Sequence, residues 1–283
     1  MSSRDENISN ADFGRLRKLI YHQAGINLGA DKRAMLELRI KRRLRSLNLN
    51  SYGQYCDYLF AHDGQQDEIV HLIDVVTTNK TDFFREPGHF EFLVRKAVPE
   101  FMVGNASRRP MLVWSAGCST GEEPYTLAMV LSEYGLVNPN FRFRVLATDV
   151  STSVLEKAQL GVFSGDTLRP VPVELRRKYF MRSRDPDSNL LRVVPELRRL
   201  VEFRRLNLMD EDFGLSEKVD AVFCRNVIIY FDRSTQERIL QKIIHYLVPG
   251  GYTFVGHAET LHTMDIPLVP VAPALYRKTD ART

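Results

Sequence analysis

The sequence predicts an α/β protein in which an all-α domain precedes a doubly wound sheet with a small antiparallel β insertion. Three observations predict this class. Residues 10–75 show helical apolar periodicity and no strand signal. Strand-like apolar runs alternate with helices from residue 111 onward, a pattern typical of parallel sheets with right-handed crossovers. An arginine-rich stretch at about 162–206 interrupts that alternation with short strand-like runs.

Residues 1–76 are expected to form the helical domain. ADFGRLRKLIYHQAG (11–25) has apolar residues near a 3.6-residue period and ends on a glycine. In residues 31–47, Leu36, Ile40, Leu44 and Leu47 recur every three or four residues, which predicts a second helix. SYGQYCDYLFAH and GQQDEIVHLIDVVTTN indicate two shorter ones.

Residues 77–108 are expected to connect the two domains and contribute to the cofactor site, and residues 109–283 to form the sheet domain. Strands are predicted at 111–115, at 143–149, within 219–231 and at 251–257. Helices are predicted at 123–134, 151–161 and 233–247. Within the insertion, NLLRVV and RLVEFRRL are interpreted as short antiparallel strands.

Composition excludes several classes of protein. The chain has 283 residues, 44% of them hydrophobic, and a net charge of only +4, so it can bury a large core. Its three cysteines lack C-x-x-C spacing and indicate neither a disulfide framework nor a zinc site. The N-terminus is polar, and no apolar run approaches the roughly 20 residues of a membrane span. A cytoplasmic protein without membrane insertion is expected.

The segment LVWSAGCSTGEEPYTLA (112–128) joins a predicted strand to a helix through a glycine loop. Gly117 would let a ligand approach the backbone, and Asp149, which ends the next strand, would accept hydrogen bonds from a ribose diol. Glu122 and Glu123 stand where a dinucleotide's pyrophosphate would lie, and they would repel it. Acids also complement a helix dipole, which is the structural interpretation for one of the two. A cationic cofactor, S-adenosylmethionine, fits the pair best.

Five blocks carry a resemblance to a known family: TTNKTDFFRE (77–86), VWSAGCSTGEEPYTLA (113–128), ATDVSTSVLEKAQLG (147–161), FCRNVIIYFD (223–232) and LVPGGYTFVGHAET (247–260). In this order they resemble the CheR family of chemotaxis receptor glutamate methyltransferases, from about residue 10 to 277. The resemblance implies a Rossmann-like class I methyltransferase domain. It also implies transfer of a methyl group from S-adenosylmethionine to receptor glutamates, which leaves S-adenosylhomocysteine and glutamate methyl esters during sensory adaptation.

The resemblance implies the site residues as well. Arg85 and Tyr230 would flank the transferred methyl group and orient the incoming carboxylate, which needs no general base because it is already ionised. No metal is expected. The cofactor contacts, with Gly117 added from its place in the loop, would be Asn79, Thr81, Arg85, Gly117, Glu122, Asp149, Asn207, Leu208, Asn226 and Val227.

The predicted helix at 31–47 carries a broad basic face. A face of this kind is often only solvated, and it would also suit nucleic acid, a membrane surface or an acidic protein helix. The resemblance favours the cytoplasmic helical bundle of chemotaxis receptors, with Arg39, Arg42, Arg43 and Arg45 as docking residues. The protein would then act as a monomer and be recruited to membrane receptor arrays through protein contacts.

Some features depart from the pattern or count against alternatives. Some family members hold a receptor tether through a glycine-bearing loop, but residues 181–193 contain no glycine, so tether-independent action is expected. His257, Glu259 and His262 do not have the spacing of a zinc helix. A nucleic-acid methyltransferase and a non-catalytic adaptor that binds S-adenosylmethionine remain alternatives. The strand end Arg225-Asn226-Val227, unlike N-P-P-Y, counts against the first, and intact Arg85 and Tyr230 count against the second.

Overall fold

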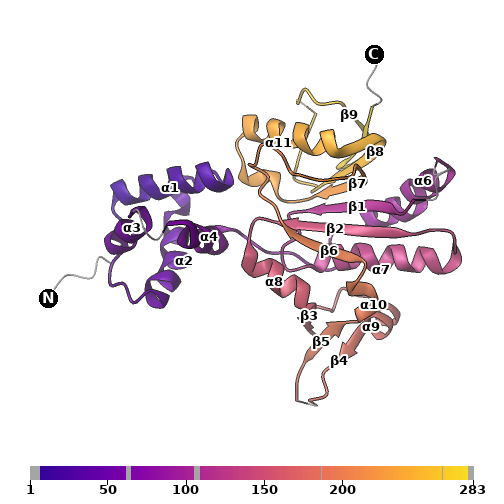
Figure 1. The fold of residues 1–283 in the computed structure, drawn as a ribbon, viewed down its shortest axis with the longest axis horizontal. Coiled ribbons are helices and arrows are strands. Elements are labelled where there is room, and N and C mark those ends of the chain that lie inside the picture. The colour runs from indigo at the N-terminus through magenta and orange to yellow at the C-terminus, as the bar shows by residue number, and fades with distance from the viewer. Residues whose placement is uncertain (1–6, 62–64, 105–108, 186, 263, 280–283) are drawn as a thin grey trace.

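A helical domain at the N-terminal end stands beside a larger sheet domain in the computed structural model (Figure 1). The structure describes residues 7–61, 65–104, 109–185, 187–262 and 264–279. The helical domain contains α1 (Asn10–Ala24), the 3₁₀ turn η1 (Ala30–Lys32), α2 (Arg33–Ser46), α3 (Tyr52–Phe60) and α4 (Gln65–Val76). Its helices enclose an apolar core of their own, which includes Leu16, Ile20 and Tyr55. No helix among the described residues is long and apolar enough to cross a bilayer.

Local sequence sets the ends of these helices. The Ser9 hydroxyl accepts a hydrogen bond from the Asp12 amide and caps α1. Gly25 ends α1 at φ 70°, a left-handed conformation that glycine adopts without strain. After α4 the chain runs without regular structure to α5 (Gly88–Phe92), a π-helical turn η2 (Leu93–Ala97) and α6 (Val98–Gly104).

The main sheet has seven strands in the order β6-β2-β1-β7-β8-β10-β9. The first five strands of this order are parallel, and β10 and β9 add an antiparallel edge. The strands are β1 (Met111–Ala116), β2 (Phe143–Asp149), β6 (Val201–Arg205), β7 (Val219–Cys224), β8 (Leu247–Val255), β9 (Leu268–Ala272) and β10 (Leu275–Lys278).

Helices cover both faces of this sheet, so it is doubly wound (Figure 1). Helices α7 (Glu122–Val137), α8 (Thr152–Leu160) and α10 (Pro195–Arg198) lie on one side, and α11 (Arg233–Tyr246) lies on the other. Alternate residues of β1 enter different cores, since Val113 packs on the α7 side and Trp114 on the α11 side. The α/β class predicted from the sequence is confirmed.

One strand differs from its prediction. Residues 201–205 were expected to pair antiparallel within the insertion, but β6 runs parallel to β2 at the edge of the main sheet, with Val201 opposite Val145. An edge strand has one exposed side, so its mixed polar pattern looks like that of a half-exposed antiparallel strand. The short strands β9 and β10 were not predicted, and the edge position of β9 accommodates Pro270.

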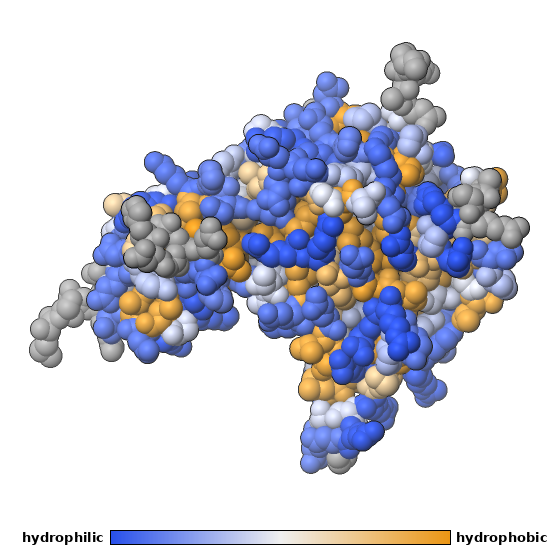
Figure 2. Space-filling model, viewed as in Figure 1, coloured by the Kyte–Doolittle hydropathy of each residue, from blue (hydrophilic) through white to orange (hydrophobic). Residues whose placement is uncertain are grey.

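A second, antiparallel sheet has the order β3-β5-β4 and projects from the main domain (Figure 1). It consists of β3 (Val162–Ser164), β4 (Phe180–Arg182) and β5 (Leu190–Val193), with α9 (Val173–Tyr179) beside it. Figure 2 shows apolar residues on the flank of this projection. Leu160, Val162 and Leu190 are among the exposed apolar side chains of this part of the chain.

Candidate functional site

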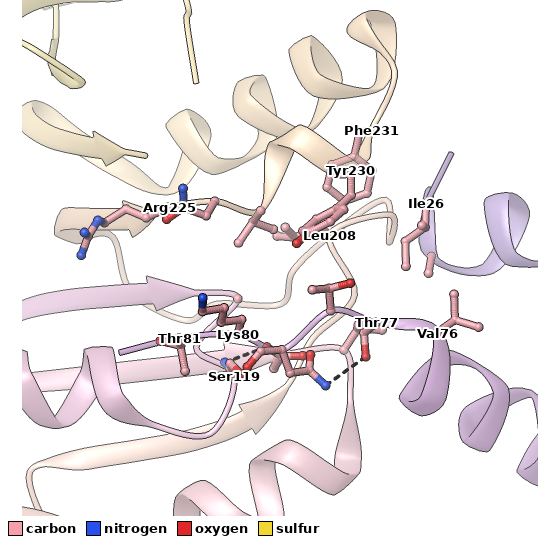
Figure 3. A pocket seen from close by; sticks show the side chains of 18 of the residues that line it. Ile26, Val76, Thr77, Lys80, Thr81, Ser119, Leu208, Arg225, Tyr230 and Phe231 are labelled. Carbon is pink, nitrogen blue, oxygen red and sulfur yellow. Dashed lines mark hydrogen bonds between the residues drawn. The ribbon is translucent and has the colours of Figure 1, made fainter. Parts of the chain in front are cut away.

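A cavity opens where the carboxyl ends of the parallel strands meet the helical domain (Figure 3). Strands β2 and β6 lie on one side of β1, and strands β7 and β8 lie on its other side. The strand order therefore reverses between β1 and β7. Open α/β sheets bind ligands at such a switch point. Nearly all predicted site residues line the cavity: Asn79, Thr81, Arg85, Gly117, Asp149, Asn207, Leu208, Asn226, Val227 and Tyr230.

Gly117 joins two walls of the cavity. It has φ 82°, and an added Cβ would lie 2.4 Å from Cγ2 of Val227. The loops that follow β1 and β7 therefore meet only because residue 117 has no side chain.

Asp149 ends β2 with a buried carboxylate on the cavity wall. Its Oδ2 accepts a hydrogen bond from the Ser119 amide at 2.9 Å, and Oδ1 accepts one from the Ser151 amide at 3.0 Å. Burial raises the pKa of Asp149, and these amides oppose that rise. The amide of Val150 also donates to this carboxylate, which has about four acceptor positions, so acceptor capacity remains for a ligand.

The two acids that begin α7 have different positions. Glu123 lines the cavity, whereas Glu122, the residue assigned to the cofactor, is absent from the lining residues that the structure describes. The carboxylate of Glu122 instead accepts a hydrogen bond from the Thr120 hydroxyl at 2.7 Å. Burial raises the pKa of both glutamates.

Arg225 holds three segments together at the cavity wall. Its side chain is 2% exposed, and it pairs with Glu86 at 2.9 Å and with Glu123 at 3.1 Å. It also donates a hydrogen bond to the main-chain oxygen of Arg85. A buried guanidinium needs such partners, and here they fix the connecting segment, α7 and the end of β7 in one geometry.

Glu259 anchors the loop that carries Asn226, Val227 and Tyr230. Its buried carboxylate accepts hydrogen bonds from the amides of Asn226 (2.8 Å), Val227 (2.9 Å), Ile229 (3.3 Å) and Gly256 (2.6 Å). The sequence pattern indicated Glu259 only as a candidate metal ligand and gave no sign of this anchoring role. The segment GHAET that follows β8 gives no local sign that the acid turns toward the neighbouring strand.

Backbone strain is concentrated around the cavity. Phe84, Glu86, Ser119 and Asn226 have φ of 54°, 53°, 48° and 57°. Residues other than glycine rarely adopt this region, and asparagine tolerates it better than phenylalanine or glutamate. Phe84 and Glu86 flank Arg85, so the buried bonds from Arg225 hold Arg85 within a strained segment.

The helical domain also fixes the loop with Tyr230. The amide of Asn27 donates to the main-chain oxygen of Tyr230 at 2.9 Å, and the Tyr21 hydroxyl donates to Asp232 at 2.7 Å. Figure 3 shows Tyr230 and Leu208 on one side of the cavity and Lys80, Thr81 and Ser119 on the other. Ile26 and Val76 of the helical domain lie at one end.

The four arginines predicted to dock receptors divide into two pairs. Arg39 donates to the main-chain oxygens of Val76 and Thr77, the latter at 3.1 Å. Arg43 pairs with buried Glu68 at 2.6 Å, so both side chains face inward instead of forming part of the exposed face. Arg42 and Arg45 are exposed, as is the apolar side chain of Leu38.

The residues of the cavity fit a zwitterionic adenosine cofactor. The carboxylates of Asp149 and Glu123 line it together with the cations Lys32, Lys80 and Arg85. Arg225 is already neutralised by its two glutamate partners. The cavity therefore offers acceptors for hydroxyl and ammonium groups, cations for a carboxylate, and the apolar wall of Leu208 and Val227 for a base.

Two family models match the chain. Residues 11–77 match "CheR methyltransferase, all-alpha domain" and residues 79–271 match "CheR methyltransferase, SAM binding domain". A chemotaxis protein methyltransferase of Borreliella burgdorferi is 38% identical over 96% of this chain and 95% of its own length. Chemotaxis protein methyltransferase 2 of Pseudomonas aeruginosa is 40% identical over 88% of this chain and 86% of its own. A chemotaxis protein methyltransferase of Escherichia coli is 40% identical over 91% and 87%.

Proposed function

This chain belongs to the CheR methyltransferase family, and we propose that it methylates glutamate side chains of chemotaxis receptors to give methyl esters. The family models and the relatives support S-adenosylmethionine-dependent methylation in chemotaxis. The glutamate acceptor is the part that we propose. The observation that carries it is that Arg85 and Tyr230 line the same cavity as Asp149.

The proposed chemistry requires positioning more than proton transfer. A glutamate carboxylate is ionised at neutral pH, so it attacks without losing a proton. Arg85 would hold that carboxylate through its planar guanidinium, and the Tyr230 hydroxyl would orient the attacking oxygen. The cavity lies between the helical domain and the sheet domain, and exclusion of water by the bound substrates would favour attack by a desolvated oxygen.

The cofactor half of the site follows from the same geometry. Bound S-adenosylmethionine would supply a methyl group made electrophilic by its sulfonium. Asp149 would accept hydrogen bonds from the ribose hydroxyls, and Gly117 would let the backbone approach the ligand. Of Glu122 and Glu123, the pair that the sequence analysis assigns to a cationic cofactor, Glu123 lines the cavity and would face the cationic portion. Asn79, Thr81, Asn207 and Asn226 would supply the remaining polar contacts.

Receptor docking would involve the exposed side of α2. Arg42 and Arg45 would meet acidic residues of the cytoplasmic helical bundle of a receptor, and exposed Leu38 would add apolar contact. Arg39 and Arg43 would support this helix from inside. The protein would work in the cytoplasm and reach receptor arrays in the membrane through this contact.

The test is an incubation of the protein with radiolabelled S-adenosylmethionine and a cytoplasmic receptor fragment. Methyl esters of carboxylates are base-labile, so we expect the label to enter the fragment and leave it as methanol after alkali treatment. Base-stable label in the fragment, label only in added RNA, or cofactor binding with no transfer would each refute the proposed acceptor.

A further inference from the structure

Three potential metal ligands meet behind the cavity. One ligand atom from each of Glu86, His89 and His257 lies within 4.8 Å of the other two. Glu86 comes from the connecting segment, His89 from α5, and His257 from just beyond β8. None of the three lines the cofactor cavity.

His89 is buried without the hydrogen bonds that a buried imidazole requires. Its side chain is 3% exposed, and neither ring nitrogen has a hydrogen-bond partner of normal geometry within the described residues. Nδ1 lies 3.5 Å from Oε2 of Glu86, and the carbonyl of Pro273 is near the ring. Imidazole is a common ligand of transition metals, and an unsatisfied buried nitrogen calls for an ion or water.

The other two groups can complete a site. Oε2 of Glu86 accepts from Arg225 Nη2 at 2.9 Å and Nε at 3.3 Å, whereas Oε1 accepts only the His257 amide, at 3.2 Å, among the described residues and keeps a lone pair for a metal. The His257 ring lies 5.2 Å from the His89 ring, centroid to centroid, and nearly perpendicular to it. His257 is exposed, so it can turn toward its partners and leave a fourth position open to water.

The local charge also permits a cation. Arg225 contributes one positive charge, while its partners Glu86 and Glu123 contribute two negative charges. A metal draws such ligand atoms to roughly 3.4 Å from one another, because it binds each at about 2.1 Å. The required closure from 4.8 Å is within the reach of an exposed histidine side chain.

We propose that Glu86, His89 and His257 form a site for a divalent transition metal such as Zn²⁺. Two imidazoles and a carboxylate select this class over Mg²⁺ and Ca²⁺, which prefer oxygen ligands. The spacing of His257, Glu259 and His262 counted against a metal at His257. That spacing reflects only residues close in the chain, whereas Glu86 and His89 are distant in sequence. The bound metal would tie the connecting segment next to Arg85 to the end of β8, where Glu259 anchors the Tyr230 loop.

Calorimetric titration of the protein with Zn²⁺, without an affinity tag and after dialysis against a chelator, tests the proposal. We expect one equivalent to bind per chain, and no comparable binding of Mg²⁺. His257→Ala replaces an exposed side chain and should fold normally, and it should weaken Zn²⁺ binding at least about tenfold. His71→Ala, an exposed histidine on α4, is the matched control and should bind as the unaltered protein does.

His89→Ala provides a second loss of binding if the variant folds, but His257→Ala decides the result by itself. Failure of the unaltered protein to bind Zn²⁺ would overturn the site. So would equal Zn²⁺ affinity in the unaltered protein and His257→Ala, since binding would then be at other surface groups. The readout is metal affinity, so it is independent of which substrate is methylated.

Discussion

Asp149 and Tyr230 face one cavity from different strand ends and perform different tasks in the proposed reaction. Asp149 is a buried acceptor on the cofactor side. Tyr230 is held through its main-chain oxygen by Asn27, and the residue lines the cavity. Binding and turnover should therefore depend on different side chains.

Asp149→Ala should weaken S-adenosylmethionine binding by at least about tenfold, since hydrogen bonds to a charged group contribute roughly 1.5–3 kcal/mol. Tyr230→Phe should bind the cofactor nearly as the unaltered protein does and mainly lower turnover. Calorimetry measures the first effect and steady-state kinetics the second. Equal losses of cofactor affinity in both variants would contradict this division.

The raised pKa of Asp149 predicts a pH dependence of cofactor affinity. Ribose hydroxyls donate to the ionised carboxylate, so binding should be full above the raised pKa and should weaken as pH falls through it. Asp149→Asn should bind weakly and without this pH dependence. Titrations from neutral pH downward measure it, and an identical pH profile in both proteins would count against the assignment.

Glu259→Gln tests the anchoring of the Tyr230 loop. The substitution turns one acceptor into a donor that faces amide donors, so unfolding free energy should fall by about 1–3 kcal/mol. Cofactor affinity should fall as well, because Asn226 and Val227 would shift. Denaturant unfolding and calorimetry provide the two measurements. A stable variant with normal cofactor affinity would show that the loop holds its shape without Glu259.

Helix α2 combines an internal and an external role. Arg43 pairs with Glu68, which is 2% exposed and also accepts from the Tyr55 hydroxyl at 2.9 Å. Arg42 and Arg45 have no such buried partner among the described residues and face solvent. The same basic helix therefore stabilises its domain with one set of arginines and is free to bind a partner with the other.

This separation predicts opposite effects of substitutions on α2. Arg43→Ala should cost about 3–5 kcal/mol of unfolding free energy, because it leaves the carboxylate of Glu68 buried without its partner. Arg42→Glu together with Arg45→Glu should leave thermal stability unchanged and raise KM for a receptor fragment. Thermal unfolding and initial rates at low salt, where exposed charges are least screened, measure the two effects. A change of stability without a change of KM in the double variant would exclude this docking face.

The strand and helix pattern predicted most of the sheet domain because buried parallel strands are almost continuously apolar. Edge strands were the exceptions. One side of β6 faces solvent, so the sequence could not distinguish a parallel edge strand from an antiparallel one. Likewise, the basic composition of α2 could not reveal which arginines turn inward, because Glu68 is distant in the sequence.

Across the whole molecule, the site depends on contacts between segments far apart in the chain. The carboxyl ends of parallel strands share one edge of a sheet, so Gly117 and Asp149 were predictable from their positions. Three other features were not predictable: the Arg225 cluster, the Glu259 anchor, and the group of Glu86, His89 and His257. Each joins segments that are distant in the chain, and no local sequence pattern shows that these segments lie close together. The exchange of Glu122 for Glu123 at the cavity wall has the same origin, since Arg225 and Ser115 hold Glu123 there.

The most direct test of the central claim is mass-spectrometric mapping of a receptor fragment after incubation with the protein and S-adenosylmethionine. We predict added methyl groups on glutamate side chains only, lost after mild alkali and nearly absent with Tyr230→Phe at equal times. Methyl groups on lysine, arginine or a nucleic acid, or an unmodified fragment despite bound cofactor, would contradict the account.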